Sequence, residues 1–105
     1  MPTESQLTGR LLRELRRRLP DAVIYKHNDR STAAIPDCSV TLRCQTHWFE
    51  MKIAPNIPTK LQQYYLDRLG KIAHVVTFGK LGHFVMDGEL YDFKEGVEAI
   101  AALFK

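Results

Sequence analysis

Residues 35–53 read IPDCSVTLRCQTHWFEMKI, and this stretch decides the fold. Two runs within it, 35–42 and 47–53, are rich in β-branched, aromatic or alternating residues, which favour strands. Only residues 43–46 separate them, so we expect a hairpin with a short turn. Because side chains alternate between the two faces of a strand, each run has one polar and one apolar face.

The polar faces carry the side chains of greatest chemical interest. Asp37 lies on the polar face of the first strand, and Glu50 and Lys52 lie on that of the second. A hairpin places both faces on one side of a sheet, so Asp37 and Glu50 become neighbours. Two close carboxylates repel each other unless a cation lies between them, and their oxygens suit Mg²⁺ or Mn²⁺. Lys52 is then placed to orient or deprotonate a water, or to neutralise charge on a phosphate.

A simpler interpretation exists for the same three residues. Glu50 and Lys52 also fit a surface ion pair that lies beside an unrelated Asp37 and has no catalytic role. The paired strand pattern favours the metal-site interpretation.

The rest of the chain predicts a mixed α/β fold. A helix over 4–19 is indicated by Thr3 as cap, by Gln6 at the capping-box position and by a stripe of leucines that ends at Pro20. The other expected elements are a strand at 22–26, a polar connector at 27–34, a helix at 60–69, a buried strand at 72–78, a hairpin at 84–93 and a helix at 95–104. The order is αβββαβ, a mixed central sheet flanked by helices, followed by an added C-terminal hairpin and helix.

Two details of these elements are specific enough to check. Thr59 is expected to cap the helix at 60–69, which places Leu61, Tyr65 and Leu69 on one stripe. The apolar run at 72–78 is typical of a strand that is buried on both faces and runs parallel to its neighbour.

Size and composition limit the class of protein. With 105 residues, 45% hydrophobic and 26% charged, we expect one domain over 1–105 of an ordinary globular kind. No membrane-spanning run or signal peptide is visible, so we expect a cytoplasmic or nucleoid-associated protein. Cys38 and Cys44 lack metal-ligand spacing and are interpreted as reduced thiols rather than zinc ligands.

The charge distribution favours a nucleic-acid partner. The formal net charge is +3, and basic residues crowd the first helix and the segment after the first strand. Such a field attracts phosphate backbones without reading sequence. The candidate contacts are Arg10, Arg13, Lys26, His27 and Arg30. The alternative for the helix is that its arginines only solvate an outer face.

Taken together, Pro36-Asp37 and the Glu50-x-Lys52 strand resemble the PD-(D/E)XK nuclease superfamily. The surrounding sequence resembles its compact VRR-NUC branch, which is related in fold to Holliday junction resolvases. Glu4 matches a glutamate near the start of the first helix of that branch, and residues 59–62 match its Thr-x-x-Gln helix start. The resemblance covers residues 3 to 79, with one departure at Ala34, where the branch often has a glycine.

The resemblance implies a restriction-endonuclease-like core and a Mg²⁺- or Mn²⁺-dependent endonuclease. In this scheme Asp37 and Glu50 bind the metal, the backbone carbonyl of Met51 is a further ligand and Lys52 lies beside the attacking water. Glu4 is implied as an outer ligand, although it also fits a helix-dipole role. Gln62 is implied to contact the water or a substrate phosphate, although it also fits a surface amide.

The expected substrate is DNA that is recognised by shape. The chain has no separate module for reading sequence, and stand-alone relatives in the resolvase group act on branched DNA such as four-way junctions. Cutting two strands symmetrically needs two active sites, so a homodimer is expected. Two alternatives stay open: a catalytically silent nuclease fold that binds DNA or a partner protein, and a subunit that cuts only within a larger assembly.

Overall fold

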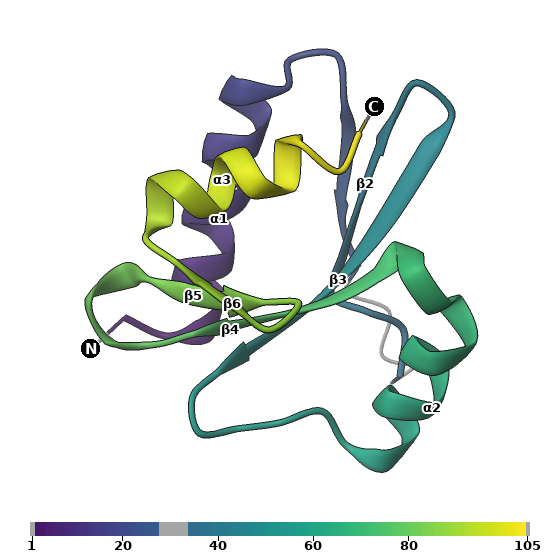
Figure 1. The fold of residues 1–105 in the computed structure, drawn as a ribbon, viewed down its shortest axis with the longest axis vertical. Coiled ribbons are helices and arrows are strands. Elements are labelled where there is room, and N and C mark those ends of the chain that lie inside the picture. Colours follow the sequence, from purple (N-terminus) through teal and green to yellow (C-terminus); the bar gives the residue numbers. More distant parts are fainter. Residues whose placement is uncertain (1, 28–33, 105) are drawn as a thin grey trace.

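The computed structural model describes residues 2–27 and 34–104, which form a mixed α/β structure (Figure 1). The helices are α1 (Glu4–Arg18), α2 (Lys60–Leu69) and α3 (Phe93–Ala101). The strands are β1 (Val23–Lys26), β2 (Cys38–Leu42), β3 (Gln45–Ile53), β4 (Ala73–Phe78), β5 (Phe84–Met86) and β6 (Glu89–Tyr91). Short 3-10 turns occupy Gly70–Ile72 and Lys80–Gly82. No helix in the described ranges has both the length and the apolar character needed to cross a bilayer.

The six strands lie in one sheet whose spatial order follows the chain, β1-β2-β3-β4-β5-β6. Neighbouring strands are antiparallel except β3 and β4, which are parallel and are joined through α2. A parallel pair requires such a crossover, because its strands start at the same edge of the sheet. The predicted order of helices and strands and the predicted mixed sheet are therefore confirmed.

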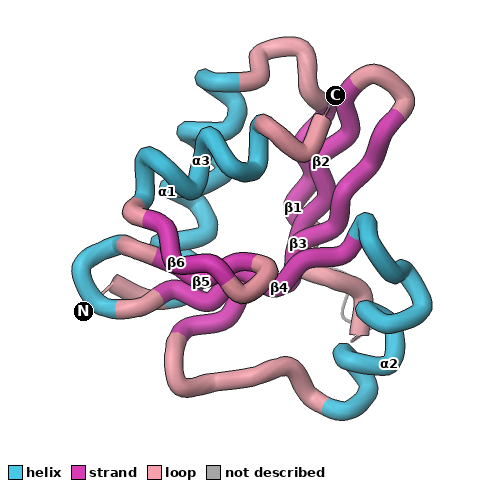
Figure 2. The backbone as a smooth tube through the Cα atoms, in the orientation of Figure 1, coloured by secondary structure: helices cyan, strands magenta, loops and turns pink. Residues whose placement is uncertain are grey.

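The helices cover the two faces of the sheet unequally. In Figures 1 and 2, α1 and α3 lie together on one face, and α2 lies on the other. We call the face under α1 and α3 the core face and the other face the open face. α2 covers only part of the open face, which carries the polar side chains of β2 and β3.

The core face is built from the predicted apolar positions. The buried side chains that form one cluster include the leucines of α1, the inward positions of β2 to β5 and the apolar residues of α3: Leu7, Leu11, Leu12, Leu15, Cys38, Val40, Phe49, Met51, Val76, Phe78, Phe84, Met86, Val97 and Ile100. The predicted cap of α1 is also present, since Thr3 Oγ1 accepts from the Gln6 N–H at 3.1 Å and Gln6 Oε1 accepts from the Thr3 N–H at 2.9 Å. Burial raises the pKa of the Cys38 thiol to about 12, so this thiol is unreactive.

The β2–β3 turn is tighter than we expected. Leu42 pairs with Gln45, so Arg43 and Cys44 alone make the turn, and β3 begins at Gln45 rather than at residue 47. Both turn residues have positive φ values, 52° and 65°, which match the twist of a two-residue hairpin. Neither residue type is favoured in that conformation, so the sequence did not indicate this turn.

The predicted face of α2 is wrong. Leu66 is the buried residue of this helix, whereas Leu61 and Tyr65 of the expected stripe are exposed. The side of the helix that carries Leu66 packs on β4, and its two tyrosines are exposed. The expectation for β4 also needs correction, because this strand is fully buried only on the core face. On the open face Val75 and Thr77 are half-buried and line a cavity.

Candidate active site

Asp37 lies directly before β2 and is tied to β3. Its Oδ2 accepts a hydrogen bond from the backbone N–H of Met51 at 2.7 Å, and its backbone carbonyl accepts from the N–H of His27 at 2.7 Å. Since Cys38 pairs with Phe49, the next position places Asp37 opposite Glu50. The structure therefore brings the two predicted carboxylates together.

Glu50 is unusually buried for a carboxylate, with 2% of its side chain exposed. Lys52 Nζ lies 3.4 Å from Glu50 Oε2 and is 15% exposed. Burial, followed by the charge of Asp37, raises the pKa of Glu50 to about 7, and Lys52 opposes this rise. Two carboxyl groups and one ammonium thus share a partly desolvated spot, where added positive charge favours the charged form of Glu50.

Glu4 lies in the first turn of α1, within electrostatic range of this spot. Its side chain is half-buried, and burial, then the charge of Asp37, raises its pKa, whereas Lys52 lowers it. The charges of Asp37 and Lys52 therefore act on the Glu4 carboxyl across the space between α1 and the sheet. Glu4 as an outer ligand of the site stays a prediction.

The backbone of Met51 also faces this spot. Its N–H points to Asp37, and the N–H and C=O of one strand residue point to the same side of the strand, so its carbonyl lies on that side too. In the described residues no group of three or more His, Cys, Asp and Glu side chains is arranged to hold a metal ion. A cation here would rest on Asp37, Glu50 and backbone or water oxygens.

Gln62 has a structural role in the described chain. Its Oε1 accepts from the backbone N–H of Thr59 at 2.9 Å, and Thr59 Oγ1 accepts from the Gln62 N–H at 3.2 Å, which forms the capping box of α2. A contact of Gln62 with a phosphate would use its amide nitrogen as donor, because Oε1 already accepts from Thr59. That contact stays a prediction.

The predicted phosphate contacts are divided between two regions. His27 adjoins Asp37 through its backbone N–H, whereas Lys26 Nζ approaches Ser5 Oγ of α1 at 3.4 Å. The guanidinium of Arg10 instead lies 4.1 Å from the centroid of the Phe93 ring, between α1 and α3. Arg13 is exposed on α1, and Arg30 lies outside the described residues.

Sequence reasoning missed an aromatic arrangement beside the carboxylates. His27 Nε2 lies 2.9 Å from Ser39 Oγ, and the imidazole stacks on Trp48 with 5.2 Å between ring centroids. Trp48 is on the same strand face as Glu50, so strand alternation was the signal that could have included it. Ile35, Pro36, Trp48, Tyr65 and Leu69 line a cavity of about 210 Å³ next to it.

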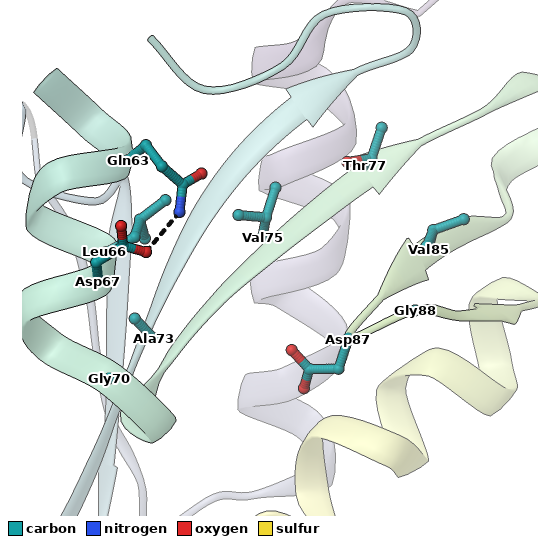
Figure 3. A pocket seen from close by; sticks show the side chains of 10 residues that line it. All are labelled: Gln63, Leu66, Asp67, Gly70, Ala73, Val75, Thr77, Val85, Asp87 and Gly88. Carbon is teal, nitrogen blue, oxygen red and sulfur yellow. Dashed lines mark hydrogen bonds between the residues drawn. The ribbon is translucent and has the colours of Figure 1, made fainter. Parts of the chain in front are cut away.

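A larger groove of about 530 Å³ crosses the open face between α2 and the β5–β6 hairpin (Figure 3). Val75 and Thr77 form its floor, and they pair with Glu50 and Lys52. Asp67, which accepts from Gln63 at 2.8 Å, adds a carboxylate to its lining, and Asp87 lies at its edge with one carboxylate oxygen 2.8 Å from His74 Nδ1. The described residues that line the groove are acidic or uncharged, so we do not assign it to a nucleic-acid backbone.

A second polar cluster lies on the core face, away from the carboxylate site. His47 Nδ1 lies 2.8 Å from His74 Nε2, and His74 Nδ1 lies 2.8 Å from Asp87 Oδ2. His74 is buried beside Phe49, and His47 packs against Phe104. The chain of hydrogen bonds satisfies the buried His74 ring, so it has a structural explanation.

Comparisons of this chain with protein-family models, with curated proteins and with solved structures found no match.

Proposed function

We propose that this protein is a divalent-metal-dependent endonuclease of the PD-(D/E)XK superfamily, in its VRR-NUC-like branch. One observation carries the proposal: Asp37, opposite Glu50, and Lys52, paired with Glu50, meet on the open face, within electrostatic range of Glu4. The β2–β3 hairpin, with the residue before it, supplies Asp37, Glu50 and Lys52, and α1 supplies Glu4. A structural ion pair of Glu50 and Lys52 has no need of a second carboxylate opposite Glu50.

The donor set fits Mg²⁺ or Mn²⁺. Mg²⁺ commonly binds through one or two carboxylates and keeps several waters, so Asp37, Glu50 and the carbonyl of Met51 are sufficient. The raised pKa of Glu50 supports this fit, because a nearby cation offsets both its burial and the charge of Asp37. Glu4 is placed to hold a metal-bound water in an outer position. When bound, such a cation polarises a phosphoryl oxygen and lowers the pKa of a water.

The remaining chemistry comes from residues of the chain. Lys52 is held by Glu50 at 3.4 Å, and its ammonium stabilises charge that develops on the phosphate in the transition state. The N–H of Met51 fixes the carboxylate of Asp37, so this ligand needs no reorganisation. Lys26 and His27 are the residues that we propose to contact the substrate backbone.

The element order also supports the superfamily assignment. The restriction-endonuclease-like core is proposed to span α1 to β4, in which β2 and β3 form the hairpin and α2 connects the parallel strands β3 and β4. The β5–β6 hairpin and α3 are then additions to this core. They extend the sheet on the β4 side and complete the core face.

For the substrate we propose branched DNA, such as a four-way junction, cut by a homodimer. A dimer supplies two active sites to two strands. The exposed apolar residues of the C-terminal hairpin and helix are the first candidates for its contact surface. In the structure Val85 and Leu90 of the hairpin are exposed, but the apolar residues of α3 are largely buried. Sedimentation of the wild-type protein and of the Leu90→Lys variant tests whether the hairpin joins two copies. The variant should then be monomeric where the wild type is a dimer.

Cleavage assays separate this function from its alternatives. Labelled four-way junction, flap and plain duplex DNA are incubated with the purified protein in Mg²⁺, in Mn²⁺ and in chelator. We expect metal-dependent cleavage that favours branched DNA and that Glu50→Gln abolishes. Binding without cleavage in either metal would favour the silent module. Cleavage that appears only after addition of a cell extract, and that Glu50→Gln still abolishes, would favour the subunit of a larger assembly.

A further inference from the structure

The cavity of about 210 Å³ lies next to the carboxylate site, because some of the residues that line it are neighbours of Asp37 and Glu50 in the chain. Pro36 is the residue immediately before Asp37, and Trp48 lies on β3 two positions before Glu50 on the same face. Tyr65 and Leu69 of α2 close the other side. Two of the segments that carry the carboxylates thus also shape the cavity.

Its size and lining restrict what it can hold. Sites for drug-sized molecules have volumes of about 300–1,000 Å³, so this cavity suits a single small ring system. Its lining side chains are aliphatic or aromatic apart from the hydroxyl of Tyr65 and the indole N–H of Trp48. Two residues along a strand span roughly 7 Å, so a ring against Trp48 lies close to any group held at Glu50.

Trp48 is already ordered by contacts outside the cavity. The imidazole of His27 stacks on the indole with an interplanar angle of 26°, and Ser39 Oγ holds that imidazole at 2.9 Å. His27 does not line the cavity, so this stack leaves the cavity side of Trp48 accessible. A preformed aromatic wall loses little conformational entropy when a ring binds to it.

We propose that this cavity receives one unpaired nucleobase from the strand whose phosphodiester lies at Asp37 and Glu50. This inference rests on the proposed nuclease function and adds a substrate class: DNA with an unpaired nucleotide next to the cut. Stacking dominates over hydrogen bonding in an apolar cavity, so the base is selected for being unpaired rather than for its identity. A nucleobase fits better than a protein side chain because the neighbouring site is adapted to phosphate chemistry and the chain carries a net charge of +3.

Trp48 is the only tryptophan of the chain, and its fluorescence therefore reports on the cavity directly. The protein in chelator and low salt is titrated with a short thymidine oligonucleotide and with an abasic oligonucleotide of the same length. We expect the thymidine strand to quench the fluorescence and to bind about 5- to 150-fold more tightly, as base–aromatic stacking of ~1–3 kcal/mol implies. Equal affinities for the thymidine and abasic oligonucleotides, without quenching, would overturn the proposal. Such a result would favour another occupant, such as a protein segment.

Adjacent tyrosines on α2 supply a matched pair of variants. Tyr65 lines the cavity and is 44% exposed, whereas Tyr64 is 53% exposed and does not line it. Tyr65→Ala is expected to reduce the preference for the thymidine strand, and Tyr64→Ala to leave it unchanged. Equal losses in both variants would contradict the assignment, because they would indicate a general effect of α2.

Different results would contradict the nuclease function and the base-binding cavity. Base-dependent binding that persists while no DNA is cleaved in Mg²⁺ or Mn²⁺ would remove the nuclease function and leave a base-binding cavity. Metal-dependent cleavage with equal binding of thymidine and abasic strands would remove the cavity proposal alone.

Discussion

The backbone N–H of Met51 donates a hydrogen bond of 2.7 Å to Oδ2 of Asp37, which ties the residue before β2 to the middle of β3. The bond closes the sheet where the ladder between β2 and β3 ends, because Cys38 and Phe49 form its last pair. It also fixes one carboxylate oxygen of Asp37. Asp37 is thus both a structural acceptor and a candidate metal ligand, and substitutions can separate these roles.

Asp37→Asn and Asp37→Ala are expected to differ in stability but not in activity. Asn keeps an oxygen that accepts the Met51 N–H, whereas Ala leaves this buried donor without its partner, at a cost of about 1–3 kcal/mol. Both variants lose the negative charge, so cleavage should fall by about 100-fold or more. Urea unfolding and initial cleavage rates measure the two effects, and equal stabilities would contradict the structural role.

Lys52 and Glu50 are expected to be strongly coupled in stability. Lys52→Met leaves Glu50, of which 2% is exposed, without its cation, and removing one partner of a buried pair typically costs about 3–5 kcal/mol. Glu50→Gln removes the carboxylate, so Lys52→Met should cost much less in that background. A double-mutant cycle at pH 8 measures the coupling, and additive effects would show that the pair is effectively solvated.

The raised pKa of Glu50 predicts the pH dependence of the metal-free protein. Between the ordinary value of 4.5 and about 7, the folded state keeps a proton that the unfolded state has released. The free energy of unfolding should therefore fall as pH rises through this window, by up to about 3 kcal/mol. Denaturant melts in chelator measure this slope, and Glu50→Gln should flatten it.

The effect of metal removal on stability is expected to depend on pH across the same range, from about 5 to 8. Mg²⁺ favours the charged carboxylates, so it should stabilise the wild-type protein more at pH 8 than at pH 5. Glu50→Gln and Asp37→Asn should reduce this difference. Two results would argue against binding at this site: an equal Mg²⁺-induced shift in the melting temperature at pH 5 and pH 8, or shifts in the two variants that equal those of the wild type.

The carboxylate site was predictable because it depends on local rules. Strand alternation fixes the faces of Glu50 and Lys52, and a short hairpin fixes the register that places Asp37 opposite Glu50. The capping box at Thr3 likewise depends on neighbouring residues and places Glu4 in the first turn of α1. Each of these inferences needs only a few consecutive residues.

Features that depend on tertiary packing were not predictable in the same way. Leu61 and Tyr65 share a helical stripe, but the side of α2 that meets β4 is the one that carries Leu66. Arg43 and Cys44 adopt positive φ because the twist of the two strands demands it, although neither residue type favours it. The pairing of His47 with His74 requires the parallel register of β3 and β4, which the sequence does not specify.

The histidine cluster gives a separate pH prediction. Burial and the neighbouring His74 lower the pKa of His47 from 6.5, and Asp87 opposes this decrease. Below pH 6.5 the unfolded state therefore binds a proton before the folded state does, so stability should fall as pH decreases through this window. His47→Asn keeps a hydrogen-bond donor to His74 without titrating and should remove this slope. Asp87→Asn should lower the pKa of His47 further, which ring-proton NMR measures, and a pKa at or above 6.5 in the wild-type protein would contradict the argument.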